Sequence, residues 1–294
     1  MSYSPTQRGV AYLALSSLLF ASMGVLIRLA SRHADNQTIV FARNLIGVLL
    51  MAPWMLRHGL ADFRTPRLPL HIARAIAGLA SMYGFFYALA HIPLANAMVF
   101  TYSAPVFIPA VAWLLLGERI TARIILATSL GFIGVILVSH PQGALLFNRY
   151  TLIGLASALL AAIAFVAVRA LSSSETPSRI VFLFACISSL ISGLLLIGHH
   201  PLPPARTCAQ LLAVGMLATA SQLCLSRAYA LAAASRIGPV NYLSIAIAGF
   251  YGWLLWGERP HLASLLGVAL ILLATLLCLS ARRPGPWRPA KAAS

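Results

Sequence analysis

Acidic side chains are the scarcest feature of this 294-residue chain, which has five Asp and Glu against 21 Lys and Arg. Charged residues make up 9% of the sequence, whereas a soluble domain has roughly 25%. This shortage excludes a water-soluble fold, because 60% of the residues are hydrophobic and no single core could bury them. A lipid bilayer has to take up these apolar side chains.

Patterns for catalysis and metal binding are also missing. The four Cys form no CxxC pair and have no His at metal-ligand spacing. The eight His lie mainly near the ends of apolar runs. No Ser or Cys nucleophile stands near a plausible base, and no phosphate-binding glycine loop is present. We therefore expect no cofactor, no metal site and no enzymatic activity.

The net charge of +16 would suggest nucleic acid in a soluble protein. Here the basic residues stand singly between apolar runs, without the clustered patch that a nucleic-acid surface needs. Such scattered charge is typical of short cytoplasmic loops. We expect the lipid bilayer and a small-molecule substrate as partners, and no nucleic acid.

Ten apolar segments follow when the chain is divided at its charges, prolines and glycines. All ten should be helical, because unpaired backbone groups are not tolerated in lipid. The segments are 9–30, 37–57, 70–90, 94–116, 122–140, 150–171, 179–198, 207–231, 237–256 and 262–281. The sequence thus predicts an all-α integral membrane protein with ten transmembrane helices, as a monomer or a homodimer.

The placement of Lys and Arg predicts the orientation. One set of alternate loops, together with both ends of the chain, holds about fifteen of them, and the other set about five. Because positive charge stays in the cytoplasm, both termini should be cytoplasmic in a bacterial inner (plasma) membrane. The first apolar run is longer than a signal-peptide core and lacks a cleavage pattern, so it should be retained as a helix.

The two halves of the chain resemble one another. Gly117-Glu118-Arg119 recurs as Gly257-Glu258-Arg259, at an offset of 140 residues that other matches share within one residue. Each half has five helices, an odd number, so the second half is inverted in the membrane. We predict repeats at 1–142 and 143–281, followed by a basic cytoplasmic tail at 282–294.

A family resemblance accompanies this repeat. The motifs that carry it are Phe41-x-Arg43, Tyr87-Ala88-Leu89, Ile92-Pro93-Leu94-Ala95-Asn96-Ala97, Pro105 in mid-helix, Leu116-Gly117-Glu118-Arg119 and the pair Gly131 and Gly134. Together they make the chain similar to the EamA family of the drug/metabolite transporter superfamily. The resemblance implies two inverted five-helix repeats around a central cavity, and metabolites, amino acids or drug-like molecules as substrates.

Arg43 is the clearest charge inside a predicted membrane segment. It lies about six residues into the second segment, roughly 9 Å from the outer end, and no Asp or Glu lies within the apolar runs to pair with it. A centred Arg costs at least about 2.5 kcal/mol. It reaches the outer head groups, binds carbonyls at a helix C-terminus, or binds an anionic group of a ligand. Arg74 and Arg227 are explained by positive-inside placement near the cytoplasmic ends.

Polar and aromatic residues at helical spacing predict the rest of the site. The predicted substrate-binding residues are Arg43, Tyr83, Tyr87, Asn96, Tyr102, Ser103, Gln222, Asn241 and Tyr242. Such residues also serve as contacts between membrane helices, which is the competing interpretation. Pro105 and Pro109 should kink the fourth helix and could form a hinge. Glu118 and Glu258 are expected to fix turns as caps or ion pairs.

These features favour a secondary transporter that works by alternating access. The excess of Arg favours a substrate with a carboxylate, which could be an amino acid, an organic acid or a zwitterion such as S-adenosylmethionine. A carrier that exports drugs or amines is the alternative, and a membrane scaffold without transport activity is a third reading.

Overall fold

The computed structural model describes residues 4–58, 65–91, 103–139, 149–197, 203–257 and 261–279. Ten helices of 13 to 27 residues lie in these ranges: α1 (Pro5–Ala30), α2 (Asn36–His58), α3 (Leu68–His91), α5 (Ala104–Leu116), α6 (Ala122–Ser139), α7 (Arg149–Leu171), α8 (Pro177–Leu196), α9 (Ala205–Leu231), α11 (Leu243–Trp256) and α12 (Leu262–Leu279). The short helix α10 (Ala234–Ile237) and the 3₁₀ helix η2 (Gly238–Tyr242) precede α11. The predicted boundary near residue 142 and the predicted tail lie outside the described residues.

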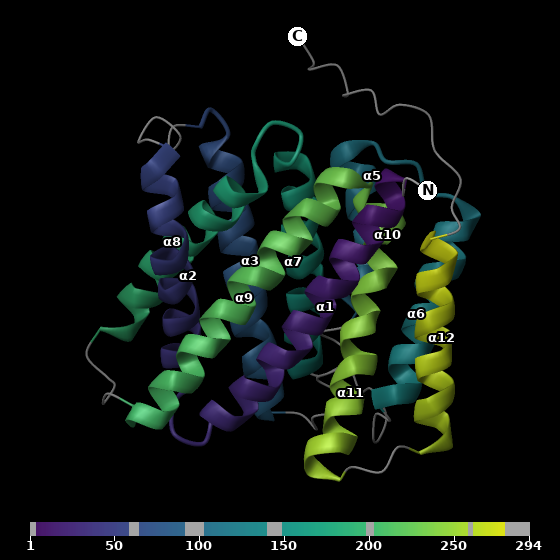
Figure 1. Ribbon diagram of the computed structural model, residues 1–294. Coiled ribbons are helices and arrows are strands. Elements are labelled where there is room, and N and C mark those ends of the chain that lie inside the picture. The colour runs from purple at the N-terminus through teal and green to yellow at the C-terminus, as the bar shows by residue number, and fades with distance from the viewer. Residues whose placement is uncertain are drawn as a thin grey trace.

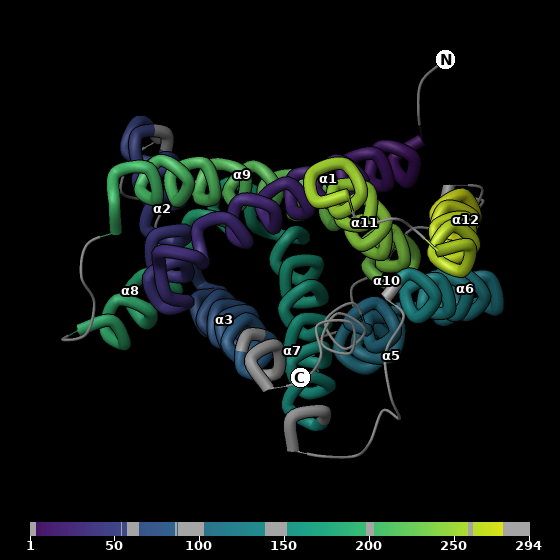
Figure 2. Tube along the Cα trace, turned by 90° about the horizontal axis from the view of Figure 1, so that it is seen from below, coloured from purple at the N-terminus to yellow at the C-terminus, as the bar shows by residue number. Residues whose placement is uncertain are grey.

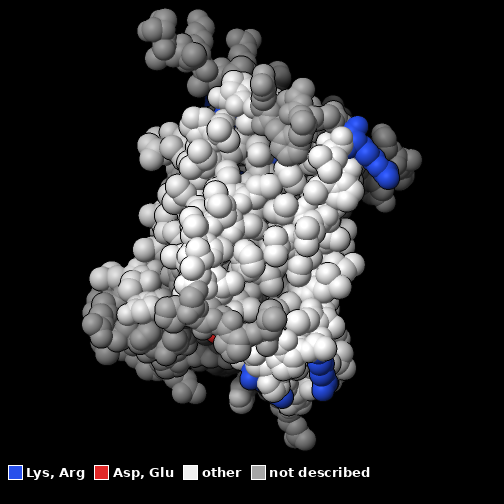
Figure 3. Space-filling view, turned by 90° about the vertical axis from the view of Figure 1, so that its left-hand side faces the viewer, with Lys and Arg blue, Asp and Glu red and all other residues white. Residues whose placement is uncertain are grey.

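The outer surfaces of the helices are apolar, as contact with lipid requires. Five of them are long and apolar enough to cross a membrane, namely α1, α2, α7, α8 and α9, and three shorter apolar helices accompany them. Large apolar side chains point outward, and Leu114 and Leu262 are each 75% exposed. On the face shown in Figure 3, basic residues are visible near the two ends and the surface between them is uncharged. The protein is therefore a multi-pass membrane protein.

The two repeats share a local turn. Gly117 ends α5 with a φ of 65° and Gly257 ends α11 with a φ of 66°. Glycine adopts this left-handed conformation without steric cost. Figure 1 places the turn after α5 at the top of the bundle and the turn after α11 at the bottom, as an inverted repeat requires. We call these the upper end and the lower end.

The described structure bears on the fourth and ninth predicted segments. The described part of the fourth segment is α5, and Pro105 lies in the first turn of this helix. Residues 92–102 before it lie outside the described residues, so the kink at Pro105 stays a prediction. Proline fits a first turn because the missing N–H would have no helical partner there. Pro109 does lie inside the helix. The ninth segment is not one helix, because it begins with the 3₁₀ helix η2 and continues as α11.

Helices of one repeat pack against helices of the other. The pairs are α1 with α9, α3 with α7, α2 with α8 and α6 with α12. Figure 2 shows the first, second and fourth of these pairs side by side from below. The first two pairs correspond to one another in the repeat, because α1 is the first helix of its half as α7 is of the other, and α3 and α9 are the third helices. In one, Ser16 Oγ donates to the Ser221 carbonyl at 2.9 Å, and in the other Ser157 Oγ donates to the Ser81 carbonyl at 2.5 Å. Small polar residues thus hold the repeats together within the membrane.

The pair α6 and α12 depends on two glycines. A Cβ on Gly134 would lie 2.7 Å from the Gly267 carbonyl oxygen, and a Cβ on Gly267 would lie 2.6 Å from the Gly134 carbonyl oxygen. The obstacle is backbone in both cases, so a rotamer change cannot relieve it. The two helices approach this closely only because both residues lack a side chain.

We predict that Gly134→Ala destabilises the protein by about 1–3 kcal/mol, because the added methyl group forces α6 and α12 apart. The measurement is the thermal unfolding midpoint of the purified protein in detergent. Gly24→Ala is the matched control, since Gly24 lies in α1 with nothing within 4 Å of its Cβ position. An unchanged midpoint for Gly134→Ala would contradict the close packing.

Candidate functional site

Two arginines are buried between α2, α3, α8 and α9. Arg43 of α2 is 8% exposed and Arg74 of α3 is 3% exposed. Of the interpretations of Arg43, the one in which it reaches the outer head groups is therefore wrong, and positive-inside placement alone does not account for the burial of Arg74. Sequence reasoning missed Arg74 because its position near a helix end suggested the membrane surface, whereas α3 packs against α7 and α8 there.

The arginines contact neutral groups. Arg74 Nη2 donates to Gln222 Oε1 at 2.7 Å, and its guanidinium lies 3.7 Å from the centre of the Phe184 ring. Arg43 Nη1 lies 3.1 Å from the sulfur of Met82, which is a weak acceptor. Within the described residues, Arg43 Nε and Arg74 Nε and Nη1 are buried without a hydrogen-bond partner. The pair therefore has donors and positive charge left to offer to an anion.

A small cavity lies between Arg43 and the two residues that contact Arg74, Phe184 and Gln222. It measures about 10 Å³, room for about one water molecule, and its lining includes Arg43, Asn44, Phe184, Thr219 and Gln222. Arg43 and Gln222, both predicted as site residues, thus face the same space. Any larger ligand group would require side chains here to move apart.

A larger groove opens at the lower end. It has a volume of about 610 Å³ and is lined by Asn36, Gln37, Tyr83, Gly84, Tyr87 and Ile153. This volume is typical of small-molecule sites. Arg43 lies seven residues beyond Asn36 on the same face of α2, about 10 Å deeper in the bundle. Tyr83 follows Met82, the residue that Arg43 contacts. The groove and the buried arginines thus share the walls formed by α2 and α3.

Of the remaining predicted residues, the three that the structure describes lie away from this site. Tyr242 is fully buried in a hydrophobic cluster that includes Val135 and Ile271, so it packs α6 and α12 together and we remove it from the site. Asn241 donates to Tyr229 Oη at 3.0 Å and thereby holds η2 against α9. Ser103 is buried at the start of α5. Asn96 and Tyr102 lie outside the described residues.

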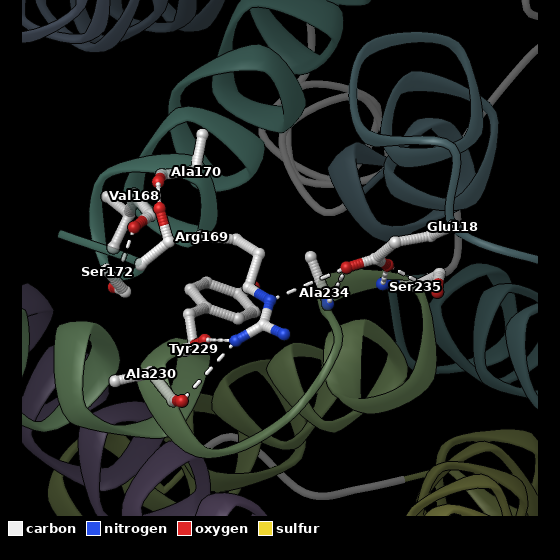
Figure 4. A network of polar contacts seen from close by, with 10 residues as sticks. Glu118, Val168, Arg169, Ala170, Ser172, Tyr229, Ala230, Ala234 and Ser235 are labelled. Carbon is white, nitrogen blue, oxygen red and sulfur yellow. Dashed lines mark hydrogen bonds and ion pairs between the residues drawn. The ribbon is translucent and has the colours of Figure 1, made fainter. Parts of the chain in front are cut away.

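A second polar cluster lies at the upper end and is centred on Glu118. This carboxylate accepts the backbone N–H groups of Ala234 and Ser235, at 3.2 and 2.9 Å, and the hydroxyl of Ser235 at 2.6 Å. Arg169 lies 3.6 Å away and also donates to the carbonyl of Tyr229 at 2.6 Å, as Figure 4 shows. The predicted cap is thus present, but it serves α10 of the other repeat rather than its own turn.

Glu175, in the turn between α7 and α8, makes a similar contact at the same end. It accepts a hydrogen bond from Thr65 of the first repeat and pairs with Arg179 at 2.6 Å. Burial opposes ionisation of this carboxyl, but the hydrogen bonds from Thr65 and Arg179 outweigh it and lower the pKa of Glu175. Two acidic residues therefore connect the repeats at the upper end.

Comparison with known families finds two matches within this chain. The model described as the EamA-like transporter family matches residues 7–140 and again residues 148–280. Each match covers one five-helix half. The double match agrees with the repeated Gly-Glu-Arg turn and with the pairing of equivalent helices.

Similar proteins are named as transporters of different substrates. The chain is 32% identical to the pseudopaline exporter of Pseudomonas aeruginosa, over 91% of this chain and 94% of the relative. It is 29% identical to the riboflavin transporter of Rhizobium johnstonii, over 91% and 89%. It is 22% identical to the S-adenosylmethionine uptake transporter of Rickettsia bellii, over 91% and 92%. A solved crystal structure with 17% identity shares the fold, with a TM-score of 0.79 over 92% of this chain and 95% of that one.

We predict that Gln222→Leu lowers the thermal unfolding midpoint, because it removes the acceptor of the buried Arg74 donor, at a cost of about 1–3 kcal/mol. The double variant Arg74→Met with Gln222→Leu should regain most of this loss, since the unpaired charge is then gone as well. The measurement is a double-mutant cycle by thermal unfolding in detergent. If the double variant loses as much stability as the two single variants combined, the contact between Arg74 and Gln222 is contradicted.

Proposed function

Because the chain belongs to the EamA-like transporter family, a family of small-molecule transporters, we propose that it is a secondary carrier that moves a small organic metabolite by alternating access. The inverted repeats support this mechanism, since two related halves can form two related conformations that open to opposite sides. We place the carrier in the bacterial inner membrane with the upper end cytoplasmic, in line with the distribution of Lys and Arg. The groove then opens to the outside.

The substrate that we propose carries a carboxylate. The observation behind this proposal is the pair Arg43 and Arg74, whose buried guanidinium groups make no ion pair within the described residues. A buried charge of this kind is costly unless it is paired. A carboxylate matches the planar guanidinium group and would accept hydrogen bonds from the N–H groups of Arg43 and Arg74 that have no partner within the described residues. Amino acids, organic acids and zwitterions such as S-adenosylmethionine have this group.

A drug or amine exporter is the second candidate. The groove supports it, because Tyr83 and Tyr87 would offer aromatic surface to a flat or cationic molecule. The arginines disfavour it, because a cation that reached them would meet two like charges without a compensating acid. We therefore prefer the carboxylate, and treat a scaffold without transport activity as the outcome if nothing binds.

We predict that compounds bearing a carboxylate raise the thermal unfolding midpoint of the purified protein, because a ligand that binds only the folded state stabilises it by mass action. The panel contains amino acids, organic acids, riboflavin, S-adenosylmethionine and amines without a carboxylate. Arg43→Gln and Arg74→Gln should each weaken binding of the active compound by about tenfold or more, as expected for loss of a charged hydrogen bond.

Arg227→Gln is the control, because Arg227 is an exposed arginine on α9, the helix that also carries Gln222. Without ligand, Arg43→Gln should leave the midpoint unchanged or raise it, since it removes a poorly compensated buried charge. A lower midpoint without ligand, together with unchanged ligand affinity, would make Arg43 structural. Hits confined to amines would favour the second candidate.

A further inference from the structure

One histidine of α3 is completely buried without a hydrogen-bond partner. His71 lies in the first turn of this helix, shortly after Thr65, and its exposed fraction is 0%. Within the described residues, neither ring nitrogen of His71 has a partner. A neutral imidazole carries one N–H donor and one acceptor nitrogen, and burying both of them unpaired is unfavourable. Apolar packing alone therefore does not explain a histidine at this position.

Charged groups from both repeats act on this histidine. On its own helix, Arg74 lies three residues further along and therefore on the same side of α3. The helices α7 and α8 pack against α3, and from this side the charges that act on the ring are Glu175, in the turn between α7 and α8, and Arg179 of α8. Glu175 favours a positive charge on His71, whereas the two arginines oppose it. The charge state of His71 thus depends on how these neighbours are compensated.

His71 is connected to the candidate substrate site through Arg74. Arg74 donates to Gln222 and belongs to the buried pair at which the proposed carboxylate would bind. A carboxylate on Arg74 would offset the positive charge that opposes protonation of His71. Coupling between two binding sites is reciprocal, so a proton on His71 would in turn raise the affinity of the site for the carboxylate. The proton and the carboxylate therefore favour one another.

We propose that His71 is a proton-binding site of the carrier, and that it takes up a proton from water when a carboxylate binds at Arg74. The neutral imidazole becomes an imidazolium, so a singly charged carboxylate and its proton together add no net charge to the bundle. His71 acts on the substrate only through Arg74 and is therefore a positioning residue. The proposal deepens the proposed function and rests on it, since it makes the carrier a co-transporter of a carboxylate and a proton.

Titration of His71 can be followed by nuclear magnetic resonance. The sample is the full-length protein in detergent micelles with isotope-labelled histidine rings, and the signal of His71 is the one that disappears in His71→Gln. The chemical shift of this signal against pH gives the proton affinity of the ring. A histidine with a purely structural role has no titration that depends on Arg74 and Glu175, so the measurement distinguishes the two roles. No substrate is needed.

We expect Arg74→Gln to raise the proton affinity of His71 about tenfold or more, because the neutral side chain reproduces the charge compensation that a bound carboxylate would bring. Glu175→Gln should lower the proton affinity by a similar factor, since it removes the charge that favours the imidazolium. Gln keeps an acceptor oxygen for Thr65 and Arg179, so this second variant should fold.

Arg227→Gln is the matched control, because Arg227 is an exposed arginine of α9 that is not among the charges acting on His71. This control should leave the proton affinity of His71 unchanged. A ring that does not titrate between about pH 5 and pH 8 in any variant would overturn the proposal. Unchanged proton affinities in both Arg74→Gln and Glu175→Gln would overturn it as well.

Sodium acetate tests the coupling to a carboxylate, with sodium chloride at the same concentration as the reference. Acetate should raise the proton affinity of His71 in the unmodified protein and should not do so in Arg74→Gln. If acetate raises the thermal unfolding midpoint but leaves His71 unchanged, the co-transport is overturned and the carboxylate site is retained. If acetate changes neither quantity while the variants shift His71 as expected, the carboxylate site of the proposed function is contradicted and the proton site is retained.

Discussion

Everything in this structure depends on the cost of burying charge in an environment with little water. The chain has few acids with which to compensate its many cations, so each buried charge has to be satisfied by a specific neighbour or carry a free-energy penalty. The upper end meets this demand within the protein, since Glu118 and Glu175 are each surrounded by donors. The interior does not, since Arg43 and Arg74 have mostly neutral neighbours.

Contacts between small residues, glycine and serine, hold the helices of the two repeats together. In a membrane, helices gain little from hydrophobic burial against one another, so they associate through close contact and hydrogen bonds. Gly134 and Gly267 bring α6 and α12 together at one side of the bundle. Serine pairs hold α1 to α9 and α3 to α7. These contacts hold helices of the two repeats together without using charged side chains. The buried charged side chains of the described residues lie instead in the interior and at the upper end.

Much of the fold was predictable from the sequence, because hydrophobic length and the repeated Gly-Glu-Arg turn are local signals. The details that failed depend on tertiary context. The ninth segment was expected to be one helix, yet it begins as the 3₁₀ helix η2 and continues as α11. Tyr242 was expected in the site, yet the missing side chain of Gly131 lets it pack against α6, since a Cβ there would lie 2.2 Å from its ring. Neither result can be read from spacing along one helix.

For the candidate site, too, only features that are visible within one segment could be predicted from the sequence. Arg43, Tyr83 and Tyr87 could be selected as candidates from the sequence, because a charge or an aromatic face stands out in an apolar run. Arg74 was assigned to the cytoplasmic end because nothing local shows that Phe184 and Gln222 of distant helices would cover it. Pairwise contacts of this kind arise only when the repeats are assembled.

The two kinds of buried charge act in opposite ways on a carrier. Charges at the upper end are satisfied by the protein, so they stabilise the conformation that keeps them together. The arginines of the interior are not, so under the proposed function they favour whichever conformation admits an anion. A ligand can shift a conformational equilibrium only by its difference in affinity for the two states. For the carboxylate substrate proposed above, contacts with Arg43 and Arg74 would alter the packing of α2, α3, α8 and α9, and the difference in affinity between two conformations would be the free energy that drives the change between them.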